Sequence, residues 1–267
     1  MGELVDWAAP VTGMGDLLGR VAVVTGVGGA RGIGYAVARA LAARGVALVV
    51  SAAGDRVHQR AHELPDGTVG VVGDLTQDGT AQWLVDEAVS RFGRLDIAVN
   101  CAGMTSTTHP DPEAGPVTEL SFETWRASLA RNLDAAFLFA QAVVPALEES
   151  DAGRLVMVSS LTGPSMAMRG EIAYGAAKAG VVGLVRGLAL DSAAAGVTVN
   201  AVAPGWIDTD SQTPAEREQG LRTPIGRSGT ADEVASLIAY LCTPSSSYLT
   251  GQCLIVDGGN SIAEERA

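Results

Sequence analysis

Cysteine, histidine and aromatic residues are scarce in this chain of 267 residues. The cysteines Cys101, Cys242 and Cys253 are odd in number and widely spaced, which favours a reducing compartment over a disulfide framework. Of the three histidines, His58 and His62 share an i,i+4 spacing, but no third ligand or HExxH glutamate accompanies them. We therefore predict no metal site.

Positive charge is also limited, with 18 Lys+Arg against 30 Asp+Glu and a formal net charge of −12. The arginines do not cluster into the basic stripe that phosphate neutralisation requires, so we expect no nucleic-acid partner. Lys178 is the one lysine among these basic residues.

Long hydrophobic runs are also missing from the sequence. No stretch approaches the roughly 20 apolar residues of a membrane span. Residues 1–19 lack the cationic start and apolar run of a secretory signal. We therefore predict a soluble, cytoplasmic protein without a membrane partner.

What the chain does contain is an alternation of short β-branched runs with segments of helical period, which predicts a parallel sheet covered by helices on both faces. The fold class is α/β, a Rossmann-type doubly wound sheet of about seven strands. Residues 1–18 are interpreted as an N-terminal extension, 19–262 as a single dinucleotide-binding domain that includes the catalytic site, and 263–267 as a tail. The expected strands are 21–25, 46–50, 68–72, 95–99, 154–158, 197–202 and 253–256, and the expected helices are 33–44, 55–63, 80–92, 121–147, 173–194 and 231–241, with a brief helix near 214–219.

A glycine-rich loop, Thr25–Gly34, joins the first strand to the first helix. Glycines allow the backbone to approach a pyrophosphate, and the free N–H groups at a helix start favour its negative charge. Because glycine also serves tight turns, such a loop alone is weak evidence. Its place between a buried strand and an amphipathic helix predicts a dinucleotide site.

Tyr174 and Lys178 lie four residues apart in a helical segment, so their side chains share one face. A phenol with a pKa of about 10 is a poor acid–base catalyst near neutral pH, and an adjacent ammonium is expected to lower that pKa. Ser160 stands at the carboxyl end of the fifth strand, and Asn132 is a polar residue amid apolar helix neighbours that requires a partner. These four residues are the candidate catalytic set.

With this ordered set, residues 19–260 resemble the short-chain dehydrogenase/reductase family, in the β-ketoacyl-ACP-reductase-like branch with its Tyr-x3-Lys motif. The resemblance implies hydride transfer between a nicotinamide cofactor and a carbonyl or secondary alcohol. Tyr174 would be the general acid/base, Ser160 would polarise the substrate oxygen, Lys178 would tune Tyr174 and bind the ribose, and Asn132 would hold a relay water.

The family's glycine pattern is Thr-Gly-x3-Gly-x-Gly, whereas five residues separate Gly26 from Gly32 here. The longer loop looks like that of the divergent enoyl-ACP reductase branch, and it leaves Gly26 and Gly28 as alternatives for the first glycine. The cofactor-binding residues that the resemblance implies are Gly26, Gly28, Arg31, Gly32, Ile33, Gly34, Ser51, Ala52, Asp74, Leu75, Asn100, Ala102, Gly103, Tyr174, Lys178, Pro204, Gly205, Ile207 and Thr209.

The choice of cofactor depends on the end of the second strand, where an acidic residue would bind the ribose 2′-OH and repel a 2′-phosphate. Ser51, Ala52 and Ala53 occupy this place, and Arg31 is available for a 2′-phosphate. NADP(H) is therefore favoured over NAD(H), with a solvated Arg31 as the alternative.

Two other functions remain as alternatives, a non-catalytic dinucleotide-binding sensor or scaffold and an enoyl reductase. Sensors of this fold typically lose the tyrosine or lysine, and enoyl reductases space the two more widely. The resemblance also implies a homotetramer. The sequence does not identify the small-molecule carbonyl or alcohol substrate.

Overall fold

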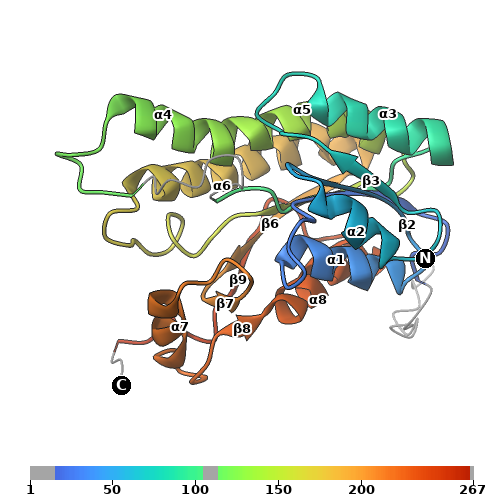
Figure 1. Ribbon diagram of the computed structural model, residues 1–267. Helices are drawn as coiled ribbons and strands as arrows, with labels where there is room; N and C mark the ends of the chain where they lie inside the picture. Colours follow the sequence, from blue (N-terminus) through green and yellow to red (C-terminus); the bar gives the residue numbers. More distant parts are fainter. Residues whose placement is uncertain (1–15, 105–113, 265–267) are drawn as a thin grey trace, which may run out of the picture.

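The centre of the protein is a parallel sheet of seven strands in the order β3-β2-β1-β4-β5-β6-β9 (Figure 1). The structure, a computed structural model, describes residues 16–104 and 114–264. All five residues of β1, VAVVT, are buried, as two-sided coverage of a parallel sheet requires. The predicted α/β fold is thus confirmed. The strands are β1 (Val21–Thr25), β2 (Ala47–Ala52), β3 (Val69–Val72), β4 (Ile97–Asn100), β5 (Arg154–Val158), β6 (Thr198–Pro204) and β9 (Cys253–Val256).

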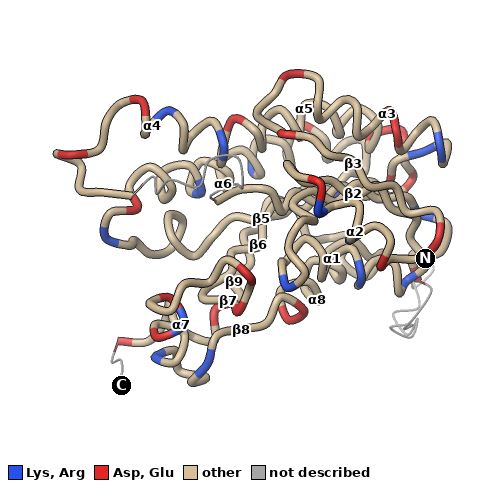
Figure 2. The backbone as a smooth tube through the Cα atoms, viewed as in Figure 1, with Lys and Arg blue, Asp and Glu red and all other residues tan. Residues whose placement is uncertain are grey.

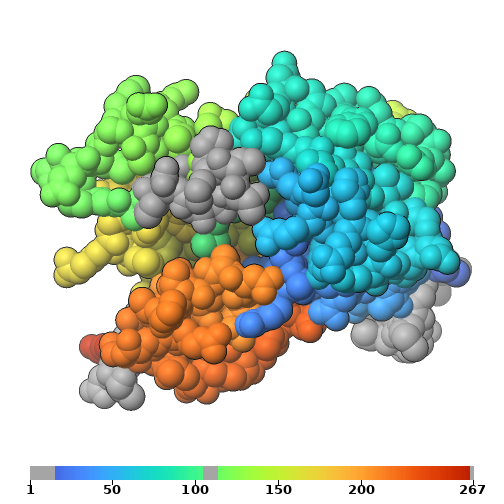
Figure 3. Space-filling view, viewed as in Figure 1, coloured from blue at the N-terminus to red at the C-terminus, as the bar shows by residue number. Residues whose placement is uncertain are grey.

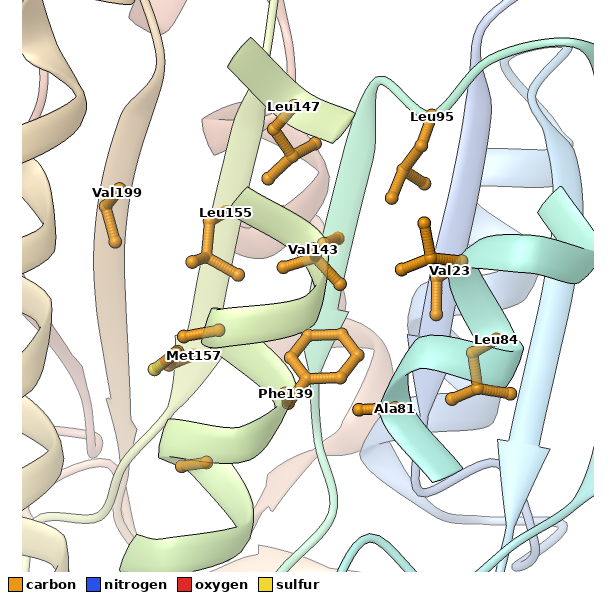
Figure 4. Packing of buried hydrophobic residues seen from close by; sticks show 14 of the residues in the cluster. Val23, Ala81, Leu84, Leu95, Phe139, Val143, Leu147, Leu155, Met157 and Val199 are labelled. Atoms are coloured by element: carbon orange, nitrogen blue, oxygen red, sulfur yellow. The ribbon is translucent and has the colours of Figure 1, made fainter. Parts of the chain in front are cut away.

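Helices cover both faces of this sheet (Figure 1). One face carries α1 (Ile33–Ala42), α2 (Arg56–His62) and α8 (Ala231–Leu241), and the other carries α3 (Thr80–Phe92), α5 (Ala135–Glu148) and α6 (Ile172–Ser192). Phe139 of α5 lies fully buried between Leu84 of α3 and Met157 of β5 (Figure 4). Truncating such a side chain to alanine costs about 3–5 kcal/mol, so this layer contributes strongly to stability.

The strand order reverses between β1 and β4, because β1 pairs with β2 on one side and β4 on the other. In sheets of this kind, ligands bind outside the carboxyl ends of the strands at such a reversal. Thr25 ends β1 and Asn100 ends β4 at this point, and their side chains are joined by a hydrogen bond of 2.8 Å.

The helix predicted over 121–147 is divided into three pieces. It consists of α4 (Phe122–Leu129), the π-helical turn η1 (Ala130–Asp134) and α5. The helical run from Phe122 to Glu148 agrees with the predicted bounds, but the π-helical turn within it was not expected. The wider turn contains Asn132, whose side chain is bonded to backbone groups on two sides.

The segment between β6 and α8 contains elements that the sequence did not predict. The two-residue strands β7 (Ile207–Asp208) and β8 (Gly229–Thr230) form a separate parallel pair. Between them lies α7 (Pro214–Leu221), in agreement with the brief helix predicted near 214–219, and it begins with a capping box of Thr213 and Glu216. The remaining short elements are the 3₁₀ turns η2 (Ala193–Ala195) and η3 (Pro244–Ser246).

One helix, α6 with its 3₁₀ extension to Ala195, is long and apolar enough to cross a membrane. The expectation that no stretch approaches this length was therefore wrong. Its apolar residues Val181, Val185 and Ala189 are buried against the sheet and α5, and the segment carries Lys178. These contacts are those of a core helix.

At the amino ends of the strands, the carboxylate of Asp96 is fully buried. It accepts hydrogen bonds from the backbone N–H of Val21 at 2.9 Å, from Arg94 Nε at 2.8 Å and from Ser150 Oγ at 2.6 Å. Burial alone would raise the pKa of Asp96, but the bonds from Arg94, Ser150 and Val21 outweigh it and hold the pKa below its usual value. This network ties β1, β4 and the start of β5 together on the side opposite the carboxyl ends.

Charged residues of both signs are interspersed over the described chain (Figure 2). Within residues 16–104 and 114–264, no group of three or more metal-ligating side chains is found. His58 and His62 line a hollow of about 280 Å³ between α2 and β3, remote from the strand reversal. All three cysteines are free thiols.

Candidate active site

The glycine loop reaches the end of β4 through Gly26, which has a φ of +74°. A Cβ added there would lie 2.7 Å from the carbonyl of Cys101, and one added to Gly34 would lie 2.6 Å from the Gly26 carbonyl oxygen. An added Cβ on Gly28 would meet only Ala52, at an ordinary 3.4 Å. Of the two alternatives for the first glycine, Gly26 has the close backbone approach that the position demands.

The loop leads directly into α1, whose N-cap is Gly32. No side chain caps this helix start, and Gly32 itself donates its N–H to the Gly29 carbonyl at 3.1 Å. The first N–H groups of α1, beginning with Ile33 and Gly34, have no intrahelical acceptor. They are positioned to bind a pyrophosphate.

A pocket lies beside this loop at the ends of β1, β2, β3 and β4. The carboxylate of Asp74 accepts bonds from Thr76 N and Thr76 Oγ1 at 2.9 and 2.8 Å, both at Oδ1, so Oδ2 takes no part in this turn. The position of Gly73 requires glycine, because an added Cβ would lie 2.6 Å from Thr80 Cγ2. The pocket is lined by Thr25, Gly26, Ser51, Ala52, Ala53, Gly73, Asp74, Leu75, Thr76, Ala102, Gly103, Arg131 and Ala135. Seven of these lining residues, Gly26, Ser51, Ala52, Asp74, Leu75, Ala102 and Gly103, are among those predicted to bind the dinucleotide.

Six lining residues were not predicted as site residues, and of these Thr25 and Arg131 carry polar groups that matter for the site; the others are Ala53, Gly73, Thr76 and Ala135. Thr25 Oγ1 bonds Asn100 Oδ1, which also accepts the N–H of Ala102 at 3.1 Å and so holds the two strand ends together. Arg131 comes from η1, immediately before Asn132. Its signal in the sequence was a basic residue next to a candidate catalytic asparagine.

Arg31 is predicted to bind a 2′-phosphate near Ser51 and Ala52, but it is not among the pocket's lining residues. Its guanidinium forms an ion pair with Asp208 and donates to the Asp208 carbonyl at 3.4 Å. Its backbone N–H donates to Asp210 Oδ2 at 3.0 Å. The structure thus places Arg31 against the chain that follows β6.

Tyr174 and Lys178 lie one turn apart on α6, with Lys178 Nζ 5.6 Å from the centre of the tyrosine ring. Lys178 is 3% exposed, and its ammonium donates to the Val158 carbonyl at the end of β5 at 3.2 Å. The neighbouring Ser159 donates from Oγ to the Lys178 carbonyl at 2.9 Å, which fixes α6 to this strand end. Ser160 follows directly and bonds Tyr174.

Asn132 joins this group from η1. Its Oδ1 accepts the N–H of Met104 at 2.8 Å, and its Nδ2 donates to the Ser128 carbonyl at 3.2 Å. A Cβ added to Gly103 would lie 2.8 Å from Lys178 Nζ and 3.0 Å from Asn132 Oδ1. Gly103 therefore marks the point where the pocket and the predicted catalytic set meet.

Burial dominates the protonation of the two central groups. It raises the pKa of Tyr174 to about 12, although the hydrogen bond with Ser160 opposes the rise. It lowers the pKa of Lys178 to about 8. The pKa of the phenol is thus raised where an adjacent ammonium was expected to lower it, because desolvation is the largest influence on Tyr174. Burial also raises the pKa of the Cys101 thiol to about 12, consistent with an inert cysteine.

The predicted nicotinamide end is built from the chain after β6. Pro204 ends that strand, and Gly205 lies so close to Asp257 that an added Cβ would be 2.8 Å from its Cβ. Ile207 is buried in β7, and Thr209 Oγ1 is 3.0 Å from Ser211 Oγ. All of these positions lie at the same carboxyl edge as the pocket (Figure 1).

Comparison with known proteins agrees with this geometry. Residues 26–261 match the family described as enoyl-(acyl carrier protein) reductase. The chain is 36% identical over 217 residues, 80% of this chain and 82% of the relative, to the (2S)-[(R)-hydroxy(phenyl)methyl]succinyl-CoA dehydrogenase subunit BbsD of Thauera aromatica. It is 35% identical over 200 residues to the 3-oxoacyl-[acyl-carrier-protein] reductase FabG of Vibrio cholerae, covering 73% and 79% of the two chains.

The FabG of Thermotoga maritima, 35% identical over 209 residues, covers 77% of this chain and 82% of its own. The family match over residues 26–261 includes the Tyr174–Lys178 helix, and the relatives' names favour an enzyme over a non-catalytic sensor. The chain belongs to the short-chain dehydrogenase/reductase family and is an NAD(P)-dependent oxidoreductase.

Proposed function

We propose that this protein reduces the 3-oxo group of an acyl thioester to a secondary alcohol with NADPH. One observation carries the chemistry, namely the convergence of Tyr174, Lys178, Ser160 and Asn132 beside Gly103. The substrate class is supported by the relatives, whose names describe a 3-oxoacyl reductase and a dehydrogenase of a CoA thioester with a hydroxyl group.

When bound, the nicotinamide supplies the hydride. The protein's residues bind the substrate oxygen and provide its proton. Ser160 donates a hydrogen bond to the carbonyl oxygen, and Tyr174, which is a neutral phenol at its pKa of about 12, gives its proton to the oxygen as negative charge develops there. Lys178, with a pKa of about 8, exchanges protons readily near neutral pH and replenishes the phenol. Asn132 Oδ1 lies on the same side of Gly103 and orients the relay.

The preference for NADP(H) is supported by the end of β2, where the buried Ser51 and the small Ala52 stand in place of a carboxylate. Arg131 adds a cation to the pocket wall. In the proposed division of the chain, residues 19–262 form one domain with this site, between an extension, 1–18, and a tail, 263–267. The extension lies mostly outside the described residues.

A homotetramer is proposed by analogy with the family, and large apolar side chains exposed on several elements support it. Phe122, Phe137 and Leu190 are 77%, 50% and 81% exposed on α4, α5 and α6, and Tyr248 and Ile262 are 102% and 86% exposed near the β9 edge. The free cysteines support a cytoplasmic location.

The second candidate is enoyl reduction, favoured by the name of the matched family and by the longer glycine loop. Tyr174 and Lys178 are one helical turn apart, which speaks for carbonyl chemistry. The deciding assay supplies the purified chain with NADPH and either acetoacetyl-CoA or crotonyl-CoA and follows the nicotinamide absorbance. We expect oxidation of NADPH with the ketone; turnover of crotonyl-CoA alone would establish the alternative.

Tyr174→Phe tests the proton donor in the same assay. The rate should fall by about 10²–10⁴-fold because general acid catalysis is lost, while the dissociation constant for NADP⁺ is unchanged. Tyr240→Phe is the matched control, because the Tyr240 hydroxyl bonds the Ser245 carbonyl at 3.4 Å on the exposed end of α8. Full activity of Tyr174→Phe would refute the proposed role.

A further inference from the structure

The lengthened glycine loop contacts the segment that follows β7, although the two are far apart in the chain. Figure 3 shows the blue loop region against the orange surface formed by the chain after β6. Two carboxylates make this contact. Asp208 forms an ion pair with the Arg31 guanidinium, and Asp210 Oδ2 accepts the Arg31 backbone N–H at 3.0 Å.

These carboxylates engage the loop's two kinds of anion-binding group. A backbone N–H of the loop binds Asp210, whose Oδ2 also lies 3.1 Å from the place of a Cβ on Gly29. The guanidinium of Arg31 is a flat donor suited equally to a carboxylate and to a phosphate. A bound dinucleotide would present its pyrophosphate to the backbone N–H groups of the loop and its 2′-phosphate to the guanidinium.

The glycine loop that carries Arg31 lies beside the pocket at the ends of β1, β2, β3 and β4. The loop is fastened to β2, because the N–H of Val27 donates to the Ser51 carbonyl at 2.9 Å. Gly28 faces Ala52 across an ordinary van der Waals distance of 3.4 Å from its would-be Cβ. The Arg31 side chain is 52% exposed and can change partner without unpacking the core.

We propose that Asp208 and Asp210 compete with the cofactor's phosphates for the glycine loop, so that Asp208 sets the selectivity for a 2′-phosphate and Asp210 sets the affinity for the pyrophosphate. This inference rests on the cofactor preference proposed above.

The two acids predict different binding signatures. Asp208→Asn removes the charge that pairs with the Arg31 guanidinium and should tighten NADP⁺ binding by about two- to fivefold, the range for an exposed ion pair, with little change for NAD⁺. Asp210→Asn removes a negative charge beside the pyrophosphate site and should tighten both dinucleotides by a similar factor. Asp232→Asn is the matched control, because Asp232 pairs with Arg39 at 2.5 Å on an exposed surface outside the loop.

The experiment is isothermal titration of the full chain with NADP⁺ and NAD⁺ at low ionic strength, where exposed charges are least screened. Melting temperatures of all variants verify that they fold. A double-mutant cycle adds Arg31→Ala, in whose background the gain from Asp208→Asn should disappear.

Unchanged or weaker NADP⁺ binding by Asp208→Asn, or an equal gain without Arg31, would overturn the role of Asp208. An effect of Asp210→Asn confined to NADP⁺, or no effect, would overturn that of Asp210. If the wild-type protein binds NAD⁺ more tightly than NADP⁺, the cofactor preference itself fails. If the wild type prefers NADP⁺ but the Asp208 and Asp210 variants bind both dinucleotides as the wild type does, this inference is refuted and the proposed cofactor preference stands.

Discussion

Lys178 is predicted to lower the stability of the protein that it serves. Its ammonium is 3% exposed, and burial lowers its pKa from 10.5 to about 8. At about 1.36 kcal/mol for each pKa unit, the charged form costs the folded state about 3 kcal/mol below pH 8. The hydrogen bond from the ammonium to the Val158 carbonyl offsets about 1 kcal/mol of this cost.

Lys178→Met should therefore unfold at higher temperature than the wild type at pH 7. A net gain of about 2 kcal/mol corresponds to a rise of about 4–8 °C in Tm at this chain length. The gain must shrink with pH, because wild-type stability rises as pH increases from about 8 to 10.5, where the unfolded lysine still binds its proton and the folded one does not. At pH 10 the ionisation cost should be about 1 kcal/mol.

The assay is thermal unfolding of both proteins at pH 7 and pH 10, together with NADPH-dependent turnover. Lys178→Met should be inactive, because methionine can neither supply a proton to Tyr174 nor donate a hydrogen bond to the nicotinamide ribose. Lys178→Arg is the charge-preserving companion. The guanidinium of arginine is broader than the ammonium and does not fit beside Gly103, so turnover should fall by about 10²–10⁴-fold. A methionine variant less stable than wild type at pH 7, a pH-independent gain, or near-normal turnover of the arginine variant would refute this reasoning.

Two further substitutions test positions on opposite sides of the sheet. Asp96→Asn should cost about 3–5 kcal/mol in urea unfolding at pH 7, because it leaves the Arg94 cation and its neighbours without their buried carboxylate. Because the pKa of Asp96 is lower in the folded than in the unfolded protein, its contribution to stability is present above the unfolded pKa and is lost as the pH falls below that value. The difference in unfolding free energy between the two proteins should therefore shrink in acid. A difference that does not change with pH would contradict the role of Asp96. Gly103→Ala should fold but lose at least about tenfold in turnover, because its Cβ would displace Lys178 Nζ or Asn132 Oδ1. Unaltered turnover of that variant would show that the two groups need not converge.

The sheet and most helices could be predicted because their signals are local. The run VAVVT at 21–25 appears as a buried strand with the expected bounds, and the helix over 80–92 also agrees. The π-helical turn could not be predicted, because it depends on the bonds of Asn132 to Ser128 and Met104. The pair β7 and β8 depends likewise on contacts between distant segments.

For the site, the spacing of Tyr174 and Lys178 was sufficient to place both on one helix face. Their pKa values were not accessible from spacing, because burial by the whole fold determines them. The partner of Arg31 could not be foreseen either, since Asp208 is 177 positions away. Long-range electrostatic partners are the part of this site that a linear pattern does not encode.

The π-helical turn has a consequence for how the α4–α5 segment tolerates change. A π turn contains one residue more than the α-helical path it interrupts, so it offsets the register of everything that follows by about 100°. The offset lets Asn132 face Gly103 while Phe139, Val143 and Leu147 still face the sheet. Removing a single residue from 130–134 would restore a continuous helix and turn that apolar stripe away from the core. The segment should therefore accept many substitutions at its exposed positions but no one-residue deletion.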